Sequence, residues 1–175
     1  SDYTPEELTM LNVPFVCCSY ANQYGTLPEG SYASVSIADE EEAYRAVTEL
    51  YRCGHRRIAA LVARTDDRAI SQLRYQGYLE ALEEAGVEFD DRLVVESGMW
   101  HRSDGVRAMN TLLDSGVEVD GVVALNDMLA SGVMHAIQMR GLRIPDDISV
   151  VGFDNSDDSQ YLSPALTPIA PGLEA

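Results

Sequence analysis

Short apolar runs recur along the chain at intervals of about one strand plus one helix. They lie at residues 58–63, 93–96, 121–125 and 148–153, and their starts are 35, 28 and 27 residues apart. Each run is apolar at consecutive positions rather than at alternate ones, which is typical of strands that are covered on both faces in a parallel sheet. The pattern therefore predicts four buried parallel strands.

The segments between these runs have helical periodicity. Apolar positions recur every three or four residues in 40–53, 71–85, 104–115 and 127–140. A glycine, which is a common helix stop, follows each segment, at Gly54, Gly86, Gly116 and Gly141. Strands alternating with helices predict an α/β fold with a doubly wound parallel sheet.

The two ends of the chain predict a piece of a longer protein. An apolar run at 13–18 precedes the other strands and has no earlier strand to pair with. Residues 31–39 alternate only partly, and we interpret them as an extended crossover from that run to the later sheet. The chain reaches 166–175 without a closing helix. We therefore expect sheet neighbours to be missing at both ends.

Composition and charge narrow the class of protein. With 46% hydrophobic and 23% charged residues, the chain is typical of a globular domain. It holds 12 basic and 29 acidic residues, so its net charge of −17 makes it a poor nucleic-acid binder by itself. Three cysteines, two of them adjacent, favour a reducing cytoplasm over a disulfide framework. No apolar run approaches the roughly 18 residues of a membrane span, so no membrane partner is expected.

Polar side chains follow the predicted strands at the edge where parallel sheets bind ligands. Arg74 lies just inside the helix after the first strand, Trp100 follows the second, Asn126 and Asp127 follow the third, and Asp154 follows the fourth. A guanidinium, an amide and a carboxylate can bridge neighbouring hydroxyl groups, while an indole covers an apolar C–H face. This set suits a neutral polyhydroxylated ligand, although a carboxylate or a nucleobase fits the same groups.

Each of these residues also has a purely structural interpretation. Asp127 fits a helix N-cap, Asn126 and Asp154 fit turn positions, Trp100 fits a half-exposed packing residue, and Arg74 fits a surface ion pair. The agreement between different strand ends favours the binding interpretation. We expect Arg74→Ala or Asp154→Ala to weaken ligand binding by more than about 1.4 kcal/mol, or tenfold, with the fold intact.

Catalytic, cofactor and metal motifs are missing from the sequence. It contains no HxxxH or CxxC pattern, no GxSxG turn, no GxxxxGK[ST] loop and no GxGxxG after a strand. The three histidines are scattered, and only His101 lies beside the predicted ligand edge. We therefore predict no catalytic residue, no cofactor and no metal, and a protein that is not an enzyme.

Several segments resemble a known family. They are CGHRRIAAL, the RxxGY pattern of Arg74 followed by LEALEEAG, then ALNDMLASGVMHAIQMRGLRIPDDISVVGFDN and YLSPALTPI. Together they resemble the ligand-binding core of the lactose/galactose repressor (LacI/GalR) family, from about Pro14 to Ile169. The segment from Asn126 to Pro164 is the most specific part of the resemblance, because its motifs occur together and in order.

The resemblance implies a two-lobed, periplasmic-binding-protein-like type I fold with an effector in the cleft between the lobes. Residues 1–38 would be the end of the N-terminal lobe and the first crossover. Residues 39–166 would be the C-terminal effector-binding lobe, and residues 167–175 the start of the return crossover. The helix-turn-helix headpiece and most of the first lobe would be absent.

The resemblance also assigns site residues. The family's effector arginine falls on Arg74, its cleft aromatic residue on Trp100, its asparagine on Asn126 and its aspartate on Asp154. The family often has an acidic residue where this chain has Ser19, followed by Tyr20, so these two are possible ligand-binding residues. The second crossover also departs from the family and reads TPIAPG.

The function implied by the resemblance is that of an effector-sensing core of a cytoplasmic transcriptional repressor. The effector would be a sugar or a related metabolite, the parent protein a homodimer, and operator DNA would be bound only through the missing headpiece. The alternative is a periplasmic-type sugar-binding protein of a transport system. A helix-turn-helix upstream would favour the repressor, and a signal peptide would favour the transporter.

Overall fold

The computed structural model describes residues 10, 16–18, 33–63, 70–153, 167–169 and 173–174, and it confirms the α/β fold. The elements in chain order are β1 (Val16–Cys18), β2 (Ala33–Ile37), α2 (Asp39–Arg52), β3 (Ile58–Val62), α3 (Ile70–Glu84), the 3-10 turn η2 (Asp91–Leu93), β4 (Val94–Glu96), α4 (Arg102–Asp114), β5 (Gly121–Ala124), α5 (Asp127–Met139), β6 (Ser149–Phe153), β7 (Thr167–Ile169) and β8 (Leu173–Glu174). The helices and strands predicted between residues 40 and 153 agree with these to within two residues at each end, as assignments of helix and strand ends commonly do.

The main sheet has five strands in the order β4-β3-β5-β6-β7, and every neighbouring pair is parallel. The four strands predicted from the apolar runs occupy four of its positions, which confirms the parallel sheet. β3 lies between β4 and β5, so that Ala60 pairs with Val94 on one side and with Val123 on the other.

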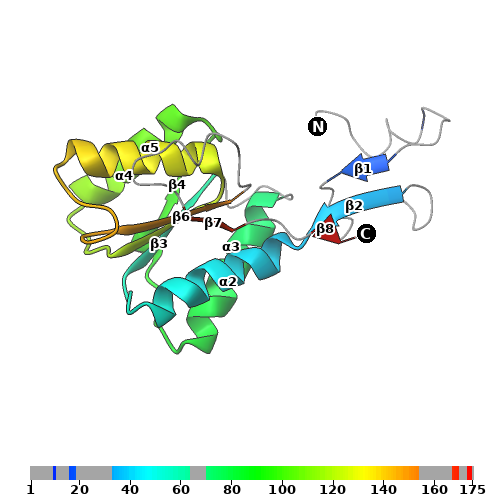
Figure 1. The fold of residues 1–175 in the computed structure, drawn as a ribbon, viewed down its shortest axis with the longest axis horizontal. Helices are drawn as coiled ribbons and strands as arrows, with labels where there is room; N and C mark the ends of the chain where they lie inside the picture. Colours follow the sequence, from blue (N-terminus) through cyan, green and yellow to red (C-terminus); the bar gives the residue numbers. More distant parts are fainter. Residues whose placement is uncertain are drawn as a thin grey trace.

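Two helical layers enclose this sheet, with α2 and α3 on one face and α4 and α5 on the other (Figure 1). The alternate residues of β3 belong to different cores. Ile58, Ala60 and Val62 join the cluster beneath α2 and α3, whereas Ala59 and Leu61 join the cluster beneath α4 and α5. All five are at most 2% exposed. This is why the run is apolar at consecutive positions.

The helix ends follow from local sequence. The first turn of α2 carries four acidic residues and its last turn carries Arg52, which complements the helix dipole at both ends. The glycines predicted to stop the four helices all have positive φ, for example +67° at Gly86 and +73° at Gly116. Glycine adopts this left-handed conformation without steric cost, so the predicted stops are confirmed.

The helices of each layer cross closely at glycine. A Cβ built on Gly77 of α3 would lie 2.0 Å from the carbonyl oxygen of Glu40 in α2. In the other layer, a Cβ on Gly132 of α5 would lie 2.1 Å from the carbonyl oxygen of Arg102, and one on Gly105 of α4 would lie 2.3 Å from that of Leu129. The backbones can approach this closely only because no side chain separates them.

A second, smaller sheet corrects the interpretation of residues 31–39. Ala33–Ile37 is a strand, β2, which pairs in parallel with β1 through Val16 and Ala33 and antiparallel with β8 through Ser36 and Glu174. The run at 13–18 therefore has a partner within this chain. The partial alternation of residues 33–37 therefore indicates a strand. Pairing as a strand also satisfies backbone N–H and C=O groups that an unpaired crossover would leave without partners.

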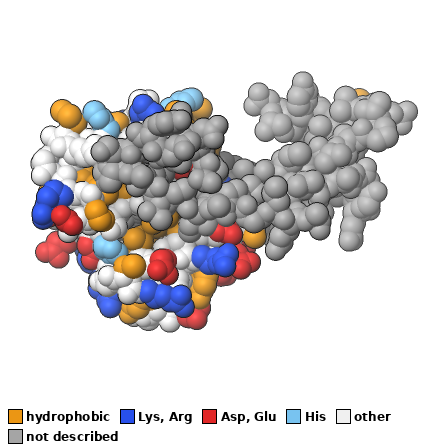
Figure 2. All heavy atoms as spheres, in the orientation of Figure 1, with side chains coloured by type: hydrophobic (Ala, Val, Ile, Leu, Met, Phe, Trp, Pro, Cys, Tyr) orange, Lys and Arg blue, Asp and Glu red, His pale blue; other side chains and the backbone are white. Residues whose placement is uncertain are grey.

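The layer formed by α2 and α3 is strongly acidic. These two helices hold eight acidic residues against three arginines, and Asp and Glu side chains are prominent over them in the lower part of Figure 2. Across their contact, the Tyr44 hydroxyl donates a hydrogen bond to Glu84. Burial raises the pKa of Glu40, and the negative charge of Glu80 raises it further. The two helices are therefore held together against charge repulsion.

Glu80→Gln is expected to raise the melting temperature at pH 7 and to leave it almost unchanged at pH 3. The pKa of Glu40 is higher in the folded chain than its ordinary value, so stability from its protonated form is present at low pH and is lost as pH rises through the folded pKa. Removing the charge of Glu80 relieves that loss by up to about 0.5 kcal/mol. Thermal unfolding followed by circular dichroism at the two pH values measures it. Equal gains in the exposed control Glu83→Gln would contradict this explanation.

Candidate functional site

Arg74 lies on the buried side of α3, with its side chain only 5% exposed. Its Nε donates to Oδ1 of Asp39 at 2.7 Å, and its Nη1 donates to the carbonyl oxygen of Leu125. Its guanidinium also lies over the ring of Phe153, 4.6 Å from the centroid. The surface ion-pair interpretation of Arg74 is therefore wrong, because the ion pair is buried on both sides.

These contacts fix Arg74 at the carboxyl ends of two neighbouring strands. Leu125 directly follows β5, and Phe153 is the last residue of β6. Asn126 and Asp154, the next residues along the chain, are two of the predicted ligand-binding residues. The guanidinium therefore lies at the sheet edge where the strand-end rule placed it.

Asn126 begins α5. Its Oδ1 accepts a hydrogen bond from the backbone N–H of Leu129 at 2.7 Å, so Asn126 is the N-cap. Its Nδ2 donates to the carbonyl oxygen of Trp100 at 3.4 Å. The interpretation of Asp127 as the cap is wrong, because Asp127 is the first helical residue and is buried in the first turn. Asn126 thus joins the start of α5 to the loop after β4.

That loop carries Trp100 across the end of β3. The backbone N–H groups of Ser97 and Gly98 donate to the carbonyl oxygens of Val62 and Ala63, both at 2.8 Å, which extends the pairing of β3 and β4. Trp100 then packs, partly buried, against both hydrophobic clusters. The structure therefore confirms that Trp100 is a packing residue. The neighbouring Met99 is 56% exposed.

The structure thus brings Arg74, Asn126 and Trp100 to one edge of the sheet, and Asp127 is buried in the first turn of α5. Ser19, Tyr20 and Asp154 lie outside the described residues. Sequence reasoning missed two partners of Arg74, namely Asp39 and Phe153. One signal was present: Arg74 lies on the helical stripe of Ser71 and Tyr78, which are fully buried, and a charge on such a stripe needs an internal partner.

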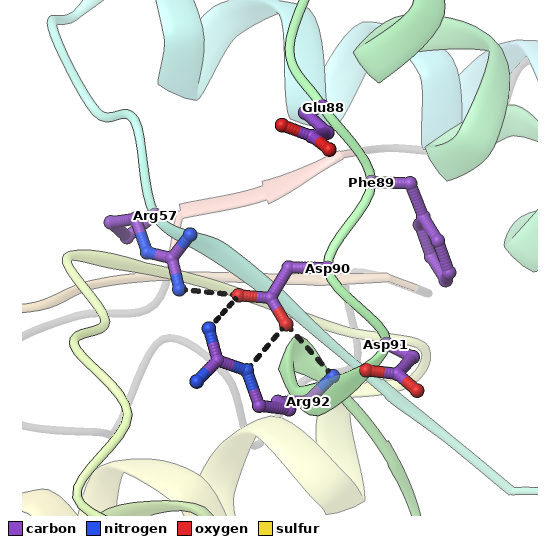
Figure 3. A pocket seen from close by; sticks show the side chains of 6 residues that line it. All are labelled: Arg57, Glu88, Phe89, Asp90, Asp91 and Arg92. Atoms are coloured by element: carbon purple, nitrogen blue, oxygen red, sulfur yellow. Dashed lines mark hydrogen bonds and ion pairs between the residues drawn. The ribbon is translucent and has the colours of Figure 1, made fainter.

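A separate pocket of about 490 Å³ lies before β3 and β4, at the opposite end of these strands. Asp90 accepts hydrogen bonds from Arg57 at 2.6 Å and from Arg92 at 2.7 and 2.8 Å (Figure 3). Hydrogen bonds from the guanidinium group of Arg92 and, to a smaller extent, from that of Arg57 hold the pKa of Asp90 well below its usual range. Asp90 also caps η2. The cluster is therefore explained by local structure. Its lining residues are Arg57, Glu88, Phe89, Asp90, Asp91 and Arg92.

Two further observations concern the described segments alone. They contain no group of three or more His, Cys, Asp or Glu side chains arranged to hold a metal ion. None of their helices combines the length and the apolarity that a bilayer crossing requires.

A lobe with a parallel sheet between two helical layers and polar groups at the carboxyl ends of its strands is typical of a ligand-binding domain. Residues 47–175 match the family described as a periplasmic binding protein-like domain. The chain belongs to this family, in the form that LacI-family transcriptional regulators carry as their effector-binding domain.

The relatives are transcriptional regulators rather than enzymes. The chain is 34% identical to the HTH-type transcriptional regulator CelR of Thermobifida fusca, over 96% of this chain and 48% of that protein. A putative LacI-family regulator from Sanguibacter keddieii is 39% identical, with a TM-score of 0.82 over 91% of this chain and 57% of that structure. A CelR–cellobiose complex is 32% identical, with a TM-score of 0.83 over 95% of this chain and 49% of that structure. The chain spans about half the length of the curated relatives it matches.

Proposed function

We propose that this chain is the effector-binding core of a transcriptional repressor that senses a neutral saccharide at the carboxyl edge of the five-stranded sheet. The observation that carries the proposal is the convergence of Arg74, Asn126 and Trp100 on that edge. An arginine and an amide bond hydroxyl groups, and an indole stacks on the apolar face of a sugar ring. The cellobiose complex of a similar regulator supports the saccharide class.

In the proposed site, Arg74, Trp100, Asn126 and Asp154 bind the saccharide. Ser19 and Tyr20 would contribute from the N-terminal lobe, and Asp127 from the start of α5. The proposed division of the chain follows: residues 1–38 belong to the N-terminal lobe and first crossover, residues 39–166 form the effector-binding lobe, and residues 167–175 begin the return crossover. Because β7 pairs with β6, that return starts within the sheet of the effector-binding lobe.

The proposed mechanism is a shift between two populations. A saccharide that bridges two lobes favours the closure angle in which it makes more contacts, and it can shift the equilibrium only by that difference in affinity. In the whole protein, two such cores would form a homodimer, and the closure angle would set the spacing of two helix-turn-helix headpieces on operator DNA. The regulator names of the relatives favour a cytoplasmic repressor over a transport protein.

Asn126→Ser is expected to weaken saccharide binding about tenfold while leaving the fold stable. Serine keeps an oxygen that caps α5, but it removes the amide that we propose as a hydrogen-bond donor to the ligand. Isothermal titration calorimetry against neutral mono- and disaccharides, cellobiose included, measures the affinity. The matched control is Asn110→Ser, since Asn110 bonds Arg140 on the outer side of the α4–α5 layer. Equal affinities for the two variants would remove Asn126 from the site.

A further inference from the structure

The ion pair of Arg74 joins two parts of the chain that are far apart in sequence. Asp39, 35 residues before Arg74, is the first residue of α2 and is 4% exposed. Only Ala38 separates it from Ile37, the last residue of β2. Asp39 therefore stands where the chain passes from the three-stranded sheet into the five-stranded sheet.

We propose that Asp39 is a positioning residue of the effector site, which fixes the direction in which Arg74 presents its guanidinium to the saccharide. This inference rests on the proposed function, because it assigns a role to a residue that acts through Arg74. Asp39 is not proposed to contact the ligand itself.

The geometry of the guanidinium supports this role. The group is planar, and its donors point in fixed directions. The bonds from Nε to Asp39 and from Nη1 to Leu125 lie along two different edges of the planar group, and the ring of Phe153 covers one of its faces. A guanidinium held in this way loses little side-chain entropy when a ligand binds, so its orientation contributes directly to affinity.

The position of Asp39 in the chain links this orientation to the connection between the sheets. The Ala38 carbonyl accepts the first backbone bond of α2, from Glu42 at 2.9 Å, so the start of the helix is rigid next to the connecting residue. A rotation of β2 against the five-stranded sheet would act first on Ala38 and the start of α2, which carries the Asp39 carboxylate bonded to Arg74. This is a physical route by which saccharide affinity can differ between open and closed forms.

The first test uses two variants of Asp39 and the tightest saccharide found in the calorimetric panel. Asp39→Asn keeps the size of the side chain but removes its charge, whereas Asp39→Glu keeps the charge and displaces it by one methylene. Both are expected to bind the saccharide about tenfold more weakly, because the Arg74 guanidinium loses its fixed orientation. In an Arg74→Lys background, Asp39→Asn is expected to cause no further loss. Glu49→Gln, an exposed acid on the same helix, is the matched control.

The second test needs no ligand. In a ¹⁵N NMR spectrum, the Nε–H of Arg74 is expected to exchange slowly with water in the wild-type chain and faster in Asp39→Asn.

Wild-type affinity and unchanged Nε–H exchange in the Asp39 variants, with binding lost in Arg74→Lys, would overturn the role of Asp39 alone. Full binding in Arg74→Lys would overturn the proposed site and this inference together. If no saccharide binds, the proposed function fails, and the exchange rate still decides whether Asp39 orients Arg74.

Discussion

Arg74→Ala is expected to lower the free energy of unfolding by about 3–5 kcal/mol, the range for removing one partner of a buried ion pair. The substitution deletes the group that neutralises the carboxylate of Asp39, in an ion pair whose two side chains are 5% and 4% exposed. It also deletes the donor to Leu125 and the cation over Phe153. Urea unfolding followed by far-UV circular dichroism measures the change as a lower midpoint.

The matched control for this prediction is Arg52→Ala. Arg52 is also a helical arginine paired with an acid, Glu49, but their side chains are 74% and 68% exposed. Its loss is expected to change stability by less than about 0.5 kcal/mol. If the two variants unfolded at the same urea concentration, the buried ion pair would not stabilise the fold. Because the loss expected for Arg74→Ala is a large fraction of the stability of a typical domain, Arg74→Lys, which keeps the positive charge, is the better variant for binding studies.

Gly132→Ala is expected to destabilise the chain by about 3 kcal/mol, at the upper end of what overpacking commonly costs. At an exposed helical position the same change stabilises a helix by up to about 1 kcal/mol, because alanine has the higher helix propensity. Here the added Cβ would lie 2.1 Å from the Arg102 carbonyl oxygen and 2.8 Å from the Val106 nitrogen, both backbone atoms. The α4–α5 crossing must therefore open, which separates two helices that share one core.

Thermal and urea unfolding of Gly132→Ala beside His135→Ala test this packing. His135 lies one turn further along α5 and is exposed. Its replacement by alanine is expected to change stability by less than about 0.5 kcal/mol. A stabilised Gly132→Ala variant would show that α4 and α5 do not cross as closely as the backbone distances indicate.

The main sheet was predictable because its signal is local. Runs such as 58–62 must be apolar at every position when both faces are covered, and the glycine after each helix must adopt positive φ. The strand Ala33–Ile37 was not recognised because it alternates only partly. Its pairing with Val16–Cys18 and Leu173–Glu174 depends on partners far along the chain, which a local pattern does not reveal.

The candidate site was predictable to the extent that topology fixes it. Parallel strands end at one edge, so the ends of β5 and β6 lie near each other, and Arg74 contacts Leu125 and Phe153 there. The partner of Arg74 was not predictable from spacing alone. Asp39 is one of four consecutive acidic residues, and only the folded backbone selects it over Glu40, Glu41 and Glu42. Likewise, only the backbone geometry shows that Asn126, and not Asp127, caps α5.

The central claim, that a saccharide binds at the carboxyl edge of the sheet, can be measured with a reporter that the chain already contains. Trp100 is the only tryptophan of the 175 residues and belongs to the proposed site. Its fluorescence should therefore be recorded while the wild-type chain and Asn126→Ser are titrated with the saccharide panel. The predicted result is a saturable change in Trp100 emission, with a midpoint about tenfold higher in Asn126→Ser. Saccharide binding seen by calorimetry with no change in Trp100 emission, or with the same midpoint in both chains, would contradict the claim.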